Sequence, residues 1–428
     1  MRIAIIAPGS RGDIQPYVPL GVGLVRAGHS VRVVTNVDHG ALVKSYGLEL
    51  WSMDIDVQSA LQSDKVSASL ESGSHIASFR QLAEIAKRGT RLLLDVGLAA
   101  CKDVDVVVTG ITGAFMAEGF AKHYGVPLVQ AFNVPLTSTT EYPGALMPGL
   151  SWGPSIRRIS HAITRQGMWM MMRAMANGVR QEKLGMPKAP LFVSGRQSGI
   201  VPGPVLYGFS AEVLPRSSDW GDDIEITGYW FADEPEGWAP PRELEAFLAA
   251  GPKPICIGFG SMSQRDPEAT TRLVLDAIAR SGQRAILIAG WGGLQVNERP
   301  EHVFQVDSIH HSWLYPRMAA VVHHGGAGTT SAGLRAGVPS IVVPFHGDQP
   351  FWGKRVHDLG AGPAPVARNR LTAERLAKAI DVAVHDKAMA VRAAELGARI
   401  RKENGVMRAV AAIERIAKGR EQRELRTV

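Results

Sequence analysis

Residues 323–330, His-His-Gly-Gly-Ala-Gly-Thr-Thr, combine the residue types that bind phosphate. They follow an apolar run at 319–322, which predicts a buried strand, and precede 331–336, which predict a helix. A glycine-rich turn before a helix exposes backbone N–H groups at the positive end of the helix dipole. Two threonine hydroxyls and an imidazole add donors. The pattern favours a phosphate site, and a nucleoside diphosphate is the natural ligand.

Other interpretations of this segment stay open. A tight strand-to-helix turn also requires glycine for backbone reasons alone, without any ligand. The segment is not a P-loop, because no Gly-Lys-Ser/Thr follows it. It also lacks the Gly-x-Gly-x-x-Gly spacing of a dinucleotide-binding loop.

A second glycine-rich loop, residues 9–13, follows the apolar run 3–7 near the N-terminus. A helix is expected over 16–27, since proline is tolerated in a first turn, and 31–35 predict the next strand. In such a βαβ unit the loop after the first strand lies at the carboxyl edge of the sheet, where ligands bind. The candidate site residues of this loop are Ser10, Arg11 and Asp13.

The alternation of strands and helices runs through the whole chain and restarts once. The first series continues with helices at 77–98 and 114–124 and strands at 104–109, 127–131, 205–209 and 224–231. The second series has strands at 254–259, 284–289 and 339–344 and helices at 268–280 and 371–384. The acidic, proline-rich break at 232–241 separates the two series. The prediction is an α/β protein with two Rossmann-like domains, whose parallel sheets face each other across a cleft.

The domain boundaries follow from that break. We expect an N-terminal domain over 1–231, a linker over 232–241, a C-terminal domain over 242–405, and a basic helical tail over 406–428 that could pack back on the N-terminal domain. Such twin domains suit a nucleotide-bound donor in the C-terminal half and an acceptor in the N-terminal half.

Composition excludes several classes of protein. The chain of 428 residues is 45% hydrophobic and 20% charged, as in ordinary globular proteins. Cys101 and Cys256, its only cysteines, lie in apolar runs, which argues against disulfides and a cysteine zinc site and fits a reducing compartment. The first residues run directly into a strand pattern, and no apolar run is long enough to cross a bilayer. We therefore expect a cytoplasmic location.

The charge, +7 in net, is unevenly placed, because 156–200 are strongly basic and 219–245 are acidic. No nucleic-acid-binding motif accompanies the basic stretch, so no nucleic-acid partner is expected. Within it, 167–175 predict a methionine-rich helix. Methionine fills irregular gaps in cores and between domains, but such a helix could also form the wall of an apolar-acceptor site or a peripheral contact with an anionic membrane. The oligomeric state is unknown.

No metal site is expected. Adjacent histidines on a strand point to opposite faces, and no acidic residue stands at the spacing of a His-Glu-x-x-His zinc site. Asp103 and Asp105 form an Asp-x-Asp pair, but nothing near them offers further oxygen ligands, and a helix-to-strand corner is the favoured interpretation.

Taken together, three segments resemble the GT-B fold glycosyltransferases that use nucleotide sugars, above all the sterol glucosyltransferases and the bacterial enzymes that glycosylate antibiotics. The segments are Gly9-Ser10-Arg11-Gly12-Asp13-Ile14-Gln15-Pro16, residues 127–143 and residues 313–353. The resemblance covers nearly the whole chain, and the combination is more specific than any single segment.

The resemblance implies a role for individual residues. His324 would contact the α-phosphate, and Ser261 the β-phosphate, while Ser10 and Arg11 would reach the same charge from across the cleft. The rest of the pyrophosphate cradle would be Gly326, Ala327, Gly328, Thr329 and Thr330. Ser308 and Ile309 would hold the base, and Asp348 and Gln349 the sugar hydroxyls. Phe132 and Trp169 are candidate acceptor contacts, and Trp291 could lie against the nucleotide, although a structural tryptophan is the favoured interpretation.

Asp13 would be the catalytic base, since the antibiotic and sterol branches place aspartate there. A carboxylate beside the acceptor hydroxyl can take its proton as the oxygen attacks the anomeric carbon. The helix dipole and His324 would stabilise the leaving diphosphate without a metal, and one in-line attack inverts the anomeric centre. The alternative for Asp13 is an N-cap of the first helix.

Two residues depart from the family pattern. Ala332 stands where plant relatives carry the glutamate that binds the ribose hydroxyls. Uridine and deoxythymidine therefore both stay open as the nucleoside of the donor. His310 stands where the close branch often has proline, so the segment that binds the base could differ in shape.

We therefore expect an inverting, metal-independent hexosyltransferase without a cofactor. Its substrates would be a UDP- or dTDP-sugar, with glucose as the first guess, and an apolar acceptor such as a sterol, macrolide, flavonoid or glycolipid. Two alternatives are a sugar-nucleotide epimerase and a non-catalytic sugar-nucleotide or lipid-binding protein. A dehydrogenase is least favoured, because the Gly-x-Gly-x-x-Gly loop is missing.

Overall fold

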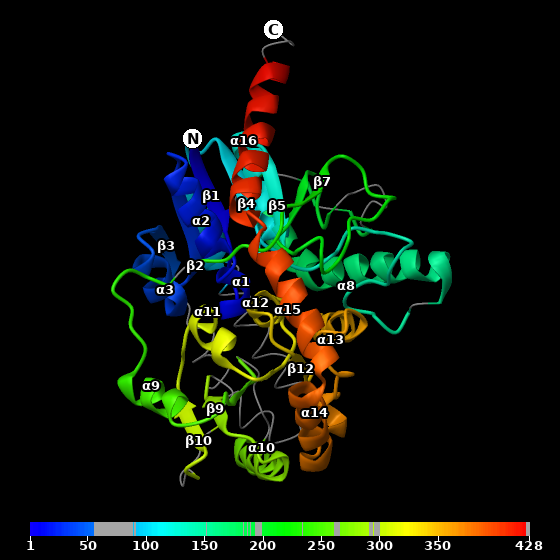
Figure 1. Ribbon diagram of the computed structural model, residues 1–428. Coiled ribbons are helices and arrows are strands. Elements are labelled where there is room, and N and C mark those ends of the chain that lie inside the picture. Colours follow the sequence, from blue (N-terminus) through cyan, green and yellow to red (C-terminus); the bar gives the residue numbers. More distant parts are fainter. Residues whose placement is uncertain are drawn as a thin grey trace.

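A computed structural model gives the structure of the chain over residues 1–54, 89, 91–150, 152–182, 184–185, 187–188, 190–192, 199–232, 234–260, 266–290, 294 and 300–424. Two sheets of parallel strands form the centres of two α/β domains, one above the other in Figure 1. None of the described helices is long and apolar enough to cross a membrane.

The N-terminal sheet has seven parallel strands in the order β3-β2-β1-β4-β5-β6-β7. In chain order they are β1 (Arg2–Ile6), β2 (Ser30–Asn36), β3 (Glu49–Met53), β4 (Val106–Thr109), β5 (Leu128–Phe132), β6 (Val205–Tyr207) and β7 (Ile224–Ile226). The central strands are continuous buried apolar runs, as a parallel sheet covered on both faces requires. The order reverses between β1 and β4, and the loops that follow these two strands leave a crevice there.

The helices of this domain cover both faces of the sheet. They are α1 (Arg11–Ile14), α2 (Tyr17–Arg26), the 3-10 helix η1 (Val37–His39), α3 (Gly40–Ser45), α7 (Ala114–Tyr124) and α8 (Gly153–Glu182). Residues 91–101 are also helical. α7 has the bounds that the sequence predicts, because Gly125 adopts the left-handed conformation (φ 65°) that ends a helix.

The C-terminal sheet repeats the same winding with five strands, in the order β10-β9-β8-β11-β12. They are β8 (Ile255–Gly258), β9 (Ala285–Ile288), β10 (Val303–Val306), β11 (Val321–His323) and β12 (Ser340–Val342). Its order reverses between β8 and β11, so the segment that begins at His324 lies at the equivalent crevice.

The helices of the second half are α9 (Arg242–Ala249), α10 (Pro267–Ser281), α11 (His311–Leu314), α12 (Ala327–Ala336), α13 (Gln349–Asp358), α14 (Ala373–His385), α15 (Lys387–Arg401) and α16 (Gly405–Glu424). Two 3-10 helices, η2 (Tyr315–Arg317) and η3 (Arg368–Arg370), join them.

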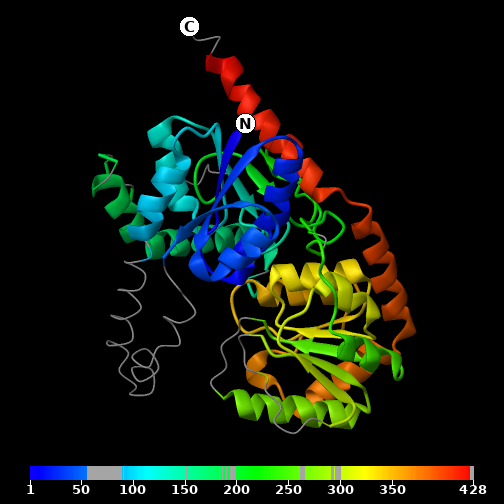
Figure 2. The same ribbon diagram turned by 90° about the vertical axis from the view of Figure 1, so that its left-hand side faces the viewer.

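α16 leaves the C-terminal domain and runs along the N-terminal one, as Figures 1 and 2 show. Its apolar side chains join the core formed by β1 and α2. His29 Nε2 lies 2.8 Å from Glu414 Oε1, and Arg415 donates to Glu225 at 2.5 Å. The tail therefore connects the two domains a second time, in addition to the segment before α9.

Three elements differ from the expectation. Residues 11–14, expected as loop, form the short helix α1. The sequence predicts a loop over 345–353, but α13 begins within it at Gln349, because Pro350 at its first turn is compatible with a helix. α8 is far longer than the predicted helix at 167–175, because apolar side chains on both of its sides hide the helical period. The helix expected over 77–98 lies partly outside the described residues.

Candidate active site

The N-terminus of α12 is the clearest anion site of the molecule. The first N–H groups of any helix lack partners within the helix, and the N-cap residue here, Gly326, has no side chain to supply one. Gly328, in the first turn, is exposed to solvent. Of the expected cradle, Gly326, Ala327, Gly328 and Thr329 lie at this open helix end, whereas Thr330 is 1% exposed and its Oγ1 is buried without a hydrogen-bond partner. These backbone groups and their dipole favour a phosphate.

His324 stands directly beside this helix end. A Cβ on Gly260, in the loop after β8, would approach its Cε1 to 2.9 Å, so two neighbouring loops fix the ring. Its Nδ1 is buried without a partner. Burial, and then the nearby His346, lower the pKa of His324 to about 4, so at neutral pH the ring is uncharged. The other ring nitrogen, Nε2, lies beside the helix end, because a Cβ on Gly326 would approach it to 2.5 Å, and it is the nitrogen placed to bond a phosphate oxygen.

His323 has a different role from its neighbour. Its side chain is 0% exposed, and its Nδ1 accepts a hydrogen bond of 3.0 Å from the Gly325 backbone N–H. Burial lowers the pKa of His323 to about 3. The bond holds the turn at Gly325, whose φ of 91° suits glycine. His323 is therefore part of the core, while His324 faces the crevice, as expected for adjacent residues of a strand end.

Asp13 lies in the crevice of the N-terminal domain, in the third position of α1. Its Oδ2 accepts hydrogen bonds of 2.8 Å from both the backbone N–H and the hydroxyl of Ser10. It is therefore not the N-cap, which is Ser10. Burial raises the pKa of Asp13, while the two bonds from Ser10 and the neighbouring His39 lower it, and the net shift is upward. A carboxyl group of raised pKa is a better proton acceptor when ionised.

Two residues that the sequence did not single out hold this loop. Asn36 Nδ2 donates to the Gly9 carbonyl oxygen at 2.9 Å, and His39 Nε2 lies 3.0 Å from the same oxygen. Asn36 is the last residue of β2 and His39 follows that strand, so the end of the second strand positions the loop after the first. The signal available in the sequence is a polar pair at the carboxyl end of the neighbouring strand.

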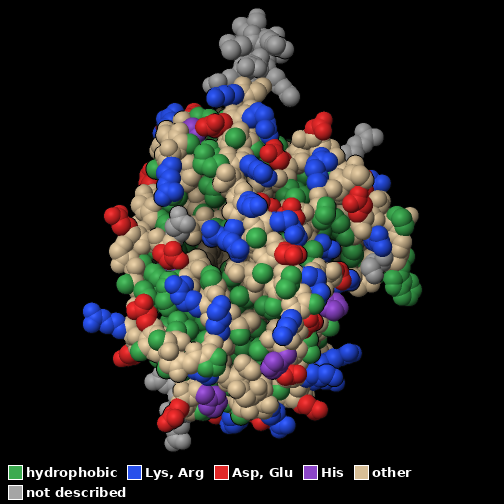
Figure 3. Space-filling model, viewed as in Figure 1, with side chains coloured by type: hydrophobic (Ala, Val, Ile, Leu, Met, Phe, Trp, Pro, Cys, Tyr) green, Lys and Arg blue, Asp and Glu red, His purple; other side chains and the backbone are tan. Residues whose placement is uncertain are grey.

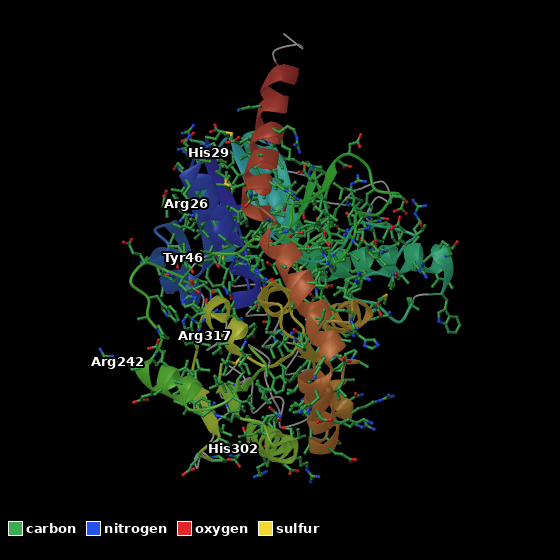
Figure 4. The ribbon with its side chains drawn as sticks, in the orientation of Figure 1. Arg26, His29, Tyr46, Arg242, His302 and Arg317 are labelled. Atoms are coloured by element: carbon green, nitrogen blue, oxygen red, sulfur yellow. The ribbon has the colours of Figure 1, made fainter. Side chains whose placement is uncertain are left out.

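Arg11 carries its charge toward the other domain. It lowers the pKa of both His310 and His311, at the start of α11, where burial is the larger cause. Tyr46, at the end of α3, interacts with the Arg11 charge. In Figure 4 Tyr46 and Arg317, just beyond α11, lie on the same side of the molecule, one in each domain. Arg11 therefore belongs to the surface at which the domains face each other.

Asp348 completes a pair of carboxyl groups across the crevice. Burial, with the charge of Asp13 as a smaller cause, raises the pKa of Asp348 to about 6. One of its oxygens, Oδ2, accepts from Trp352 Nε1 at 2.8 Å. Gln349 is buried, and its Oε1 accepts from the backbone N–H groups of Phe345 (2.7 Å) and His346 (3.2 Å), so its carbonyl oxygen is used to hold this turn.

The expected base segment lies beside an aromatic group that sequence reasoning missed. Ser308 is exposed and Ile309 half-buried, next to His310. Trp238, assigned to the linker from the sequence, packs against the rings of His310 (4.8 Å between centroids) and Trp313 (5.9 Å). A tryptophan in an otherwise proline-rich, acidic break is the signal that could have identified it.

Two expected acceptor contacts are wrong in this structure. Phe132 is 0% exposed and belongs to the core behind β5, so its side chain has no surface to offer. Trp169 is also buried, packs on Phe115 at 4.9 Å between ring centroids, and donates its N–H to the Pro190 carbonyl oxygen at 3.0 Å. Both residues are apolar aromatics near the carboxyl side of the sheet, which explains why the sequence alone did not separate them from a pocket.

Some expected residues lie outside the described part of the chain, namely Ser261 and Trp291. Among the described residues, no three His, Cys, Asp or Glu side chains form a group that could hold a metal ion. Asp105 Oδ2 accepts from the Arg2 backbone N–H at 2.6 Å, and Asp103 occupies a turn with φ 59°, so this pair forms the corner before β4.

Comparison with known proteins gives relatives in two groups. The family model described as "Erythromycin biosynthesis protein CIII-like, C-terminal domain" matches residues 272–406. A sterol 3-beta-glucosyltransferase of Arabidopsis thaliana is 34% identical over 424 residues, which cover 96% of this chain and 65% of that protein. A sterol 3-beta-glucosyltransferase of Candida albicans is 35% identical over 96% of this chain and 27% of its own length. The chain thus spans less than two thirds of these relatives.

Several solved structures of glycosyltransferases resemble it over nearly their whole length. The calicheamicin glycosyltransferase has a TM-score of 0.67 at 19% identity, with 97% of each chain covered. A Streptomyces glycosyltransferase complexed with thymidine diphosphate has a TM-score of 0.60 at 19% identity, covering 97% of this chain and 99% of that one. These matches confirm the predicted fold class. The chain therefore has the GT-B fold and is similar, along 96% of its length, to a sterol 3-beta-glucosyltransferase.

Proposed function

We propose that this chain is an inverting, metal-independent glycosyltransferase. It would move a hexose from a UDP- or dTDP-sugar to a hydroxyl of an apolar acceptor. Two relatives that are 34% and 35% identical are named sterol 3-beta-glucosyltransferases, which favours glucose as the sugar and a sterol-like or similarly apolar acceptor. Structures of the same fold hold thymidine diphosphate or dTDP, which favours a nucleoside diphosphate at the donor site.

One observation carries the proposal: a carboxylate and an open helix N-terminus face each other from opposite domains. Asp13 is close enough to Asp348, the residue before α13, to raise its pKa. The uncapped end of α12 and the Nε2 of His324, which lies beside it, belong to the same side of the C-terminal domain as Asp348. A base on one side and an anion site on the other are the two parts that transfer from a diphosphate requires.

The reaction would proceed as a single displacement. Both hydrogen bonds from Ser10 go to Asp13 Oδ2, so Oδ1 is the oxygen that would accept the proton of the acceptor hydroxyl. The hydroxyl oxygen forms a bond to the anomeric carbon from the face opposite the diphosphate. The bond from that carbon to the diphosphate oxygen breaks, and its electron pair leaves with the diphosphate. The anomeric configuration is inverted because one bond forms as the other breaks.

The N–H groups of α12 would stabilise the charge that develops on the diphosphate. They are fixed before the reaction, so no reorganisation is needed. Neutral His324 would add one hydrogen bond to a phosphate oxygen. Asp348 would accept hydrogen bonds from sugar hydroxyls once it is ionised. Because these groups supply the charge stabilisation, transfer should continue in the presence of a metal chelator.

A donor-by-acceptor panel read by mass spectrometry tests the proposal. UDP-glucose, dTDP-glucose and the corresponding galactose donors are each combined with a sterol, a macrolide, a flavonoid and a diacylglycerol. Transfer is supported by a product heavier by one hexose that requires both substrates and persists with EDTA. Donor conversion without any acceptor would instead identify an epimerase. Nucleotide binding with no product from any pair would favour a binding protein.

The same panel also compares UDP-sugars with dTDP-sugars as donors. Ala332, half-buried in α12, leaves no carboxylate for the ribose hydroxyls at this position. A carboxylate at this position could form two hydrogen bonds with the ribose hydroxyls of uridine, but not both with the deoxyribose of deoxythymidine. Without it, a uridine donor loses this advantage. We therefore expect comparable affinity for UDP and dTDP, and substitution Ala332→Glu should shift the preference toward UDP.

A further inference from the structure

The long helix α8 has two apolar sides, and only one of them belongs to the core. On the inner side, Trp169 packs on Phe115, and His161 Nε2 lies 3.0 Å from the Tyr142 carbonyl oxygen. On the outer side, four large apolar side chains are exposed: Ile156 (39%), Ile159 (54%), Ile163 (45%) and Met170 (52%). Their spacings of three, four and seven residues place them on one side of a helix.

Neighbouring segments extend this outer side into a patch. Trp152, immediately before the helix, is 80% exposed. Gly144 donates its N–H to Ser160 Oγ at 2.7 Å, which brings the segment carrying exposed Leu146 and Leu150 against α8. Gln166 Nε2 donates to the Leu191 carbonyl oxygen at 3.1 Å, which does the same for exposed Leu191 and Phe192. We call these nine side chains the α8 patch: Leu146, Leu150, Trp152, Ile156, Ile159, Ile163, Met170, Leu191 and Phe192.

A continuous apolar surface of this kind marks a contact with something outside the chain. In Figure 3, hydrophobic side chains protrude on the right-hand side, where Figure 1 places α8. Elsewhere the exposed large apolar side chains of the described residues are scattered singly, as on any soluble surface.

The charge of the same segment identifies the partner. Residues 152–192 contain seven basic residues and one acidic residue: Arg157, Arg158, Arg165, Arg173, Arg180, Lys183 and Lys188 against Glu182. Arg158 and Lys188 are exposed and Arg157 and Arg173 are half-buried, whereas Arg165 is buried and does not contribute to the surface charge. A second copy of this chain would bring two positive surfaces together, which like-charge repulsion opposes. An anionic lipid surface complements both properties, because it accepts apolar side chains and attracts the cations around them.

We propose that the α8 patch binds the surface of an anionic membrane, with α8 lying in the plane of the interface. Trp152 suits this position, because tryptophan prefers the boundary between lipid and water. The proposal is independent of the glycosyl-transfer proposal, since it concerns a surface outside the crevice.

Vesicle flotation tests it directly. The full chain is mixed with phosphatidylcholine vesicles that contain, or lack, phosphatidylglycerol, with no sugar nucleotide present. The protein is expected to float with the anionic vesicles at low salt, and less at high salt because ions screen the attraction. The variant Ile159→Gln/Ile163→Gln/Met170→Gln should reduce the bound fraction by about tenfold or more. Arg158→Glu should reduce it on anionic vesicles alone.

A matched control distinguishes the patch from general surface hydrophobicity. Val382, Val391 and Met407 are exposed to a similar degree (37%, 55% and 56%), but lie on α14, α15 and α16. Val382→Gln/Val391→Gln/Met407→Gln should float like the unchanged chain, and circular dichroism checks that each variant is folded. The proposal is overturned if the unchanged chain fails to float at low salt, or if both triple variants float equally. It is also overturned if light scattering shows a dimer that only the patch variant loses.

Discussion

The loop after β1 and the segment after β11 occupy equivalent places in two sheets of the same winding, yet their helix ends differ. At α1 the Asp13 carboxylate accepts from both the backbone N–H and the hydroxyl of Ser10, so a carboxylate already lies at this helix end. At α12 the N-cap is Gly326, and the buried Nδ1 of His324 has no partner. One crevice therefore presents a carboxylate and the other an anion site. In the proposed reaction, the same fold, used twice, would provide opposite charges for the acceptor hydroxyl and the leaving diphosphate.

The largest expected effect comes from Asp13→Asn. The asparagine keeps the shape of the side chain but cannot accept the proton, so the transfer rate should fall by roughly 10²–10⁴-fold. The affinity for UDP or dTDP, measured by calorimetry, should stay the same, since Asp13 does not contact the diphosphate in this account. Transfer at the normal rate would reduce Asp13 to a residue that holds α1.

The neighbouring histidines give the next effect and are each other's control. His324→Ala should lower nucleotide affinity by about 10- to 100-fold, the loss of one hydrogen bond to a charged group, with little change in the free energy of unfolding. His323→Ala should instead lower that free energy by about 3 kcal/mol, because it leaves a cavity and a buried Gly325 N–H without a partner. Calorimetry and urea unfolding measure the two quantities. A reversed outcome would exchange the roles of the two residues.

The pH dependence sharpens the comparison between the two carboxyl groups. Both Asp13 and Asp348 must be ionised to act, and both pKa values are raised, that of Asp348 to about 6. The rate should therefore rise with pH through about 6 and then level off. The substitution Asp348→Asn removes one negative neighbour of Asp13. The rise of the rate with pH, which then depends on Asp13 alone, should move to lower pH. An unchanged rise would mean that the two groups do not interact.

The smallest expected effect concerns the open end of α12. A Cβ on Gly328 meets nothing within 4 Å, so Gly328→Ala should fold normally and raise stability by up to about 1 kcal/mol. It should still weaken nucleotide binding, because the methyl group would occupy the space of a phosphate. Gly419→Ala, in exposed α16 with nothing within 4 Å, is the control, and should change stability without changing affinity. Equal affinity in both variants would place the diphosphate elsewhere.

Local sequence patterns predict the parts of the molecule that depend on local structure. The strand cores and α7 follow from apolar runs and from glycine at a helix end, and the two glycine-rich loops lie at the crevices that the alternation predicts. Asp13 was not predicted to lie within a helix, because four residues after a Gly-Ser turn carry little helical signal. The hydrogen bonds between Ser10 and Asp13 stabilise this short helix instead.

Contacts between distant segments could not be predicted. The burial of Phe132 depends on β6 and on the chain around Tyr207, neither of which is visible from its own neighbours. The role of Trp238 depends on α11, from another part of the chain. α8 was underestimated because exposed apolar side chains such as Ile159 accompany buried ones such as Trp169, so no single apolar period stands out.

The most direct test of this account is a crystal structure of the chain with UDP or dTDP bound. The account predicts diphosphate oxygens within about 3 Å of the backbone N–H groups in the first turn of α12, with His324 bonded to one of them. It also predicts that Asp13 faces the position of the sugar without touching a phosphate. A diphosphate bound at the loop of residues 9–13, with the N-terminus of α12 left open, would contradict it.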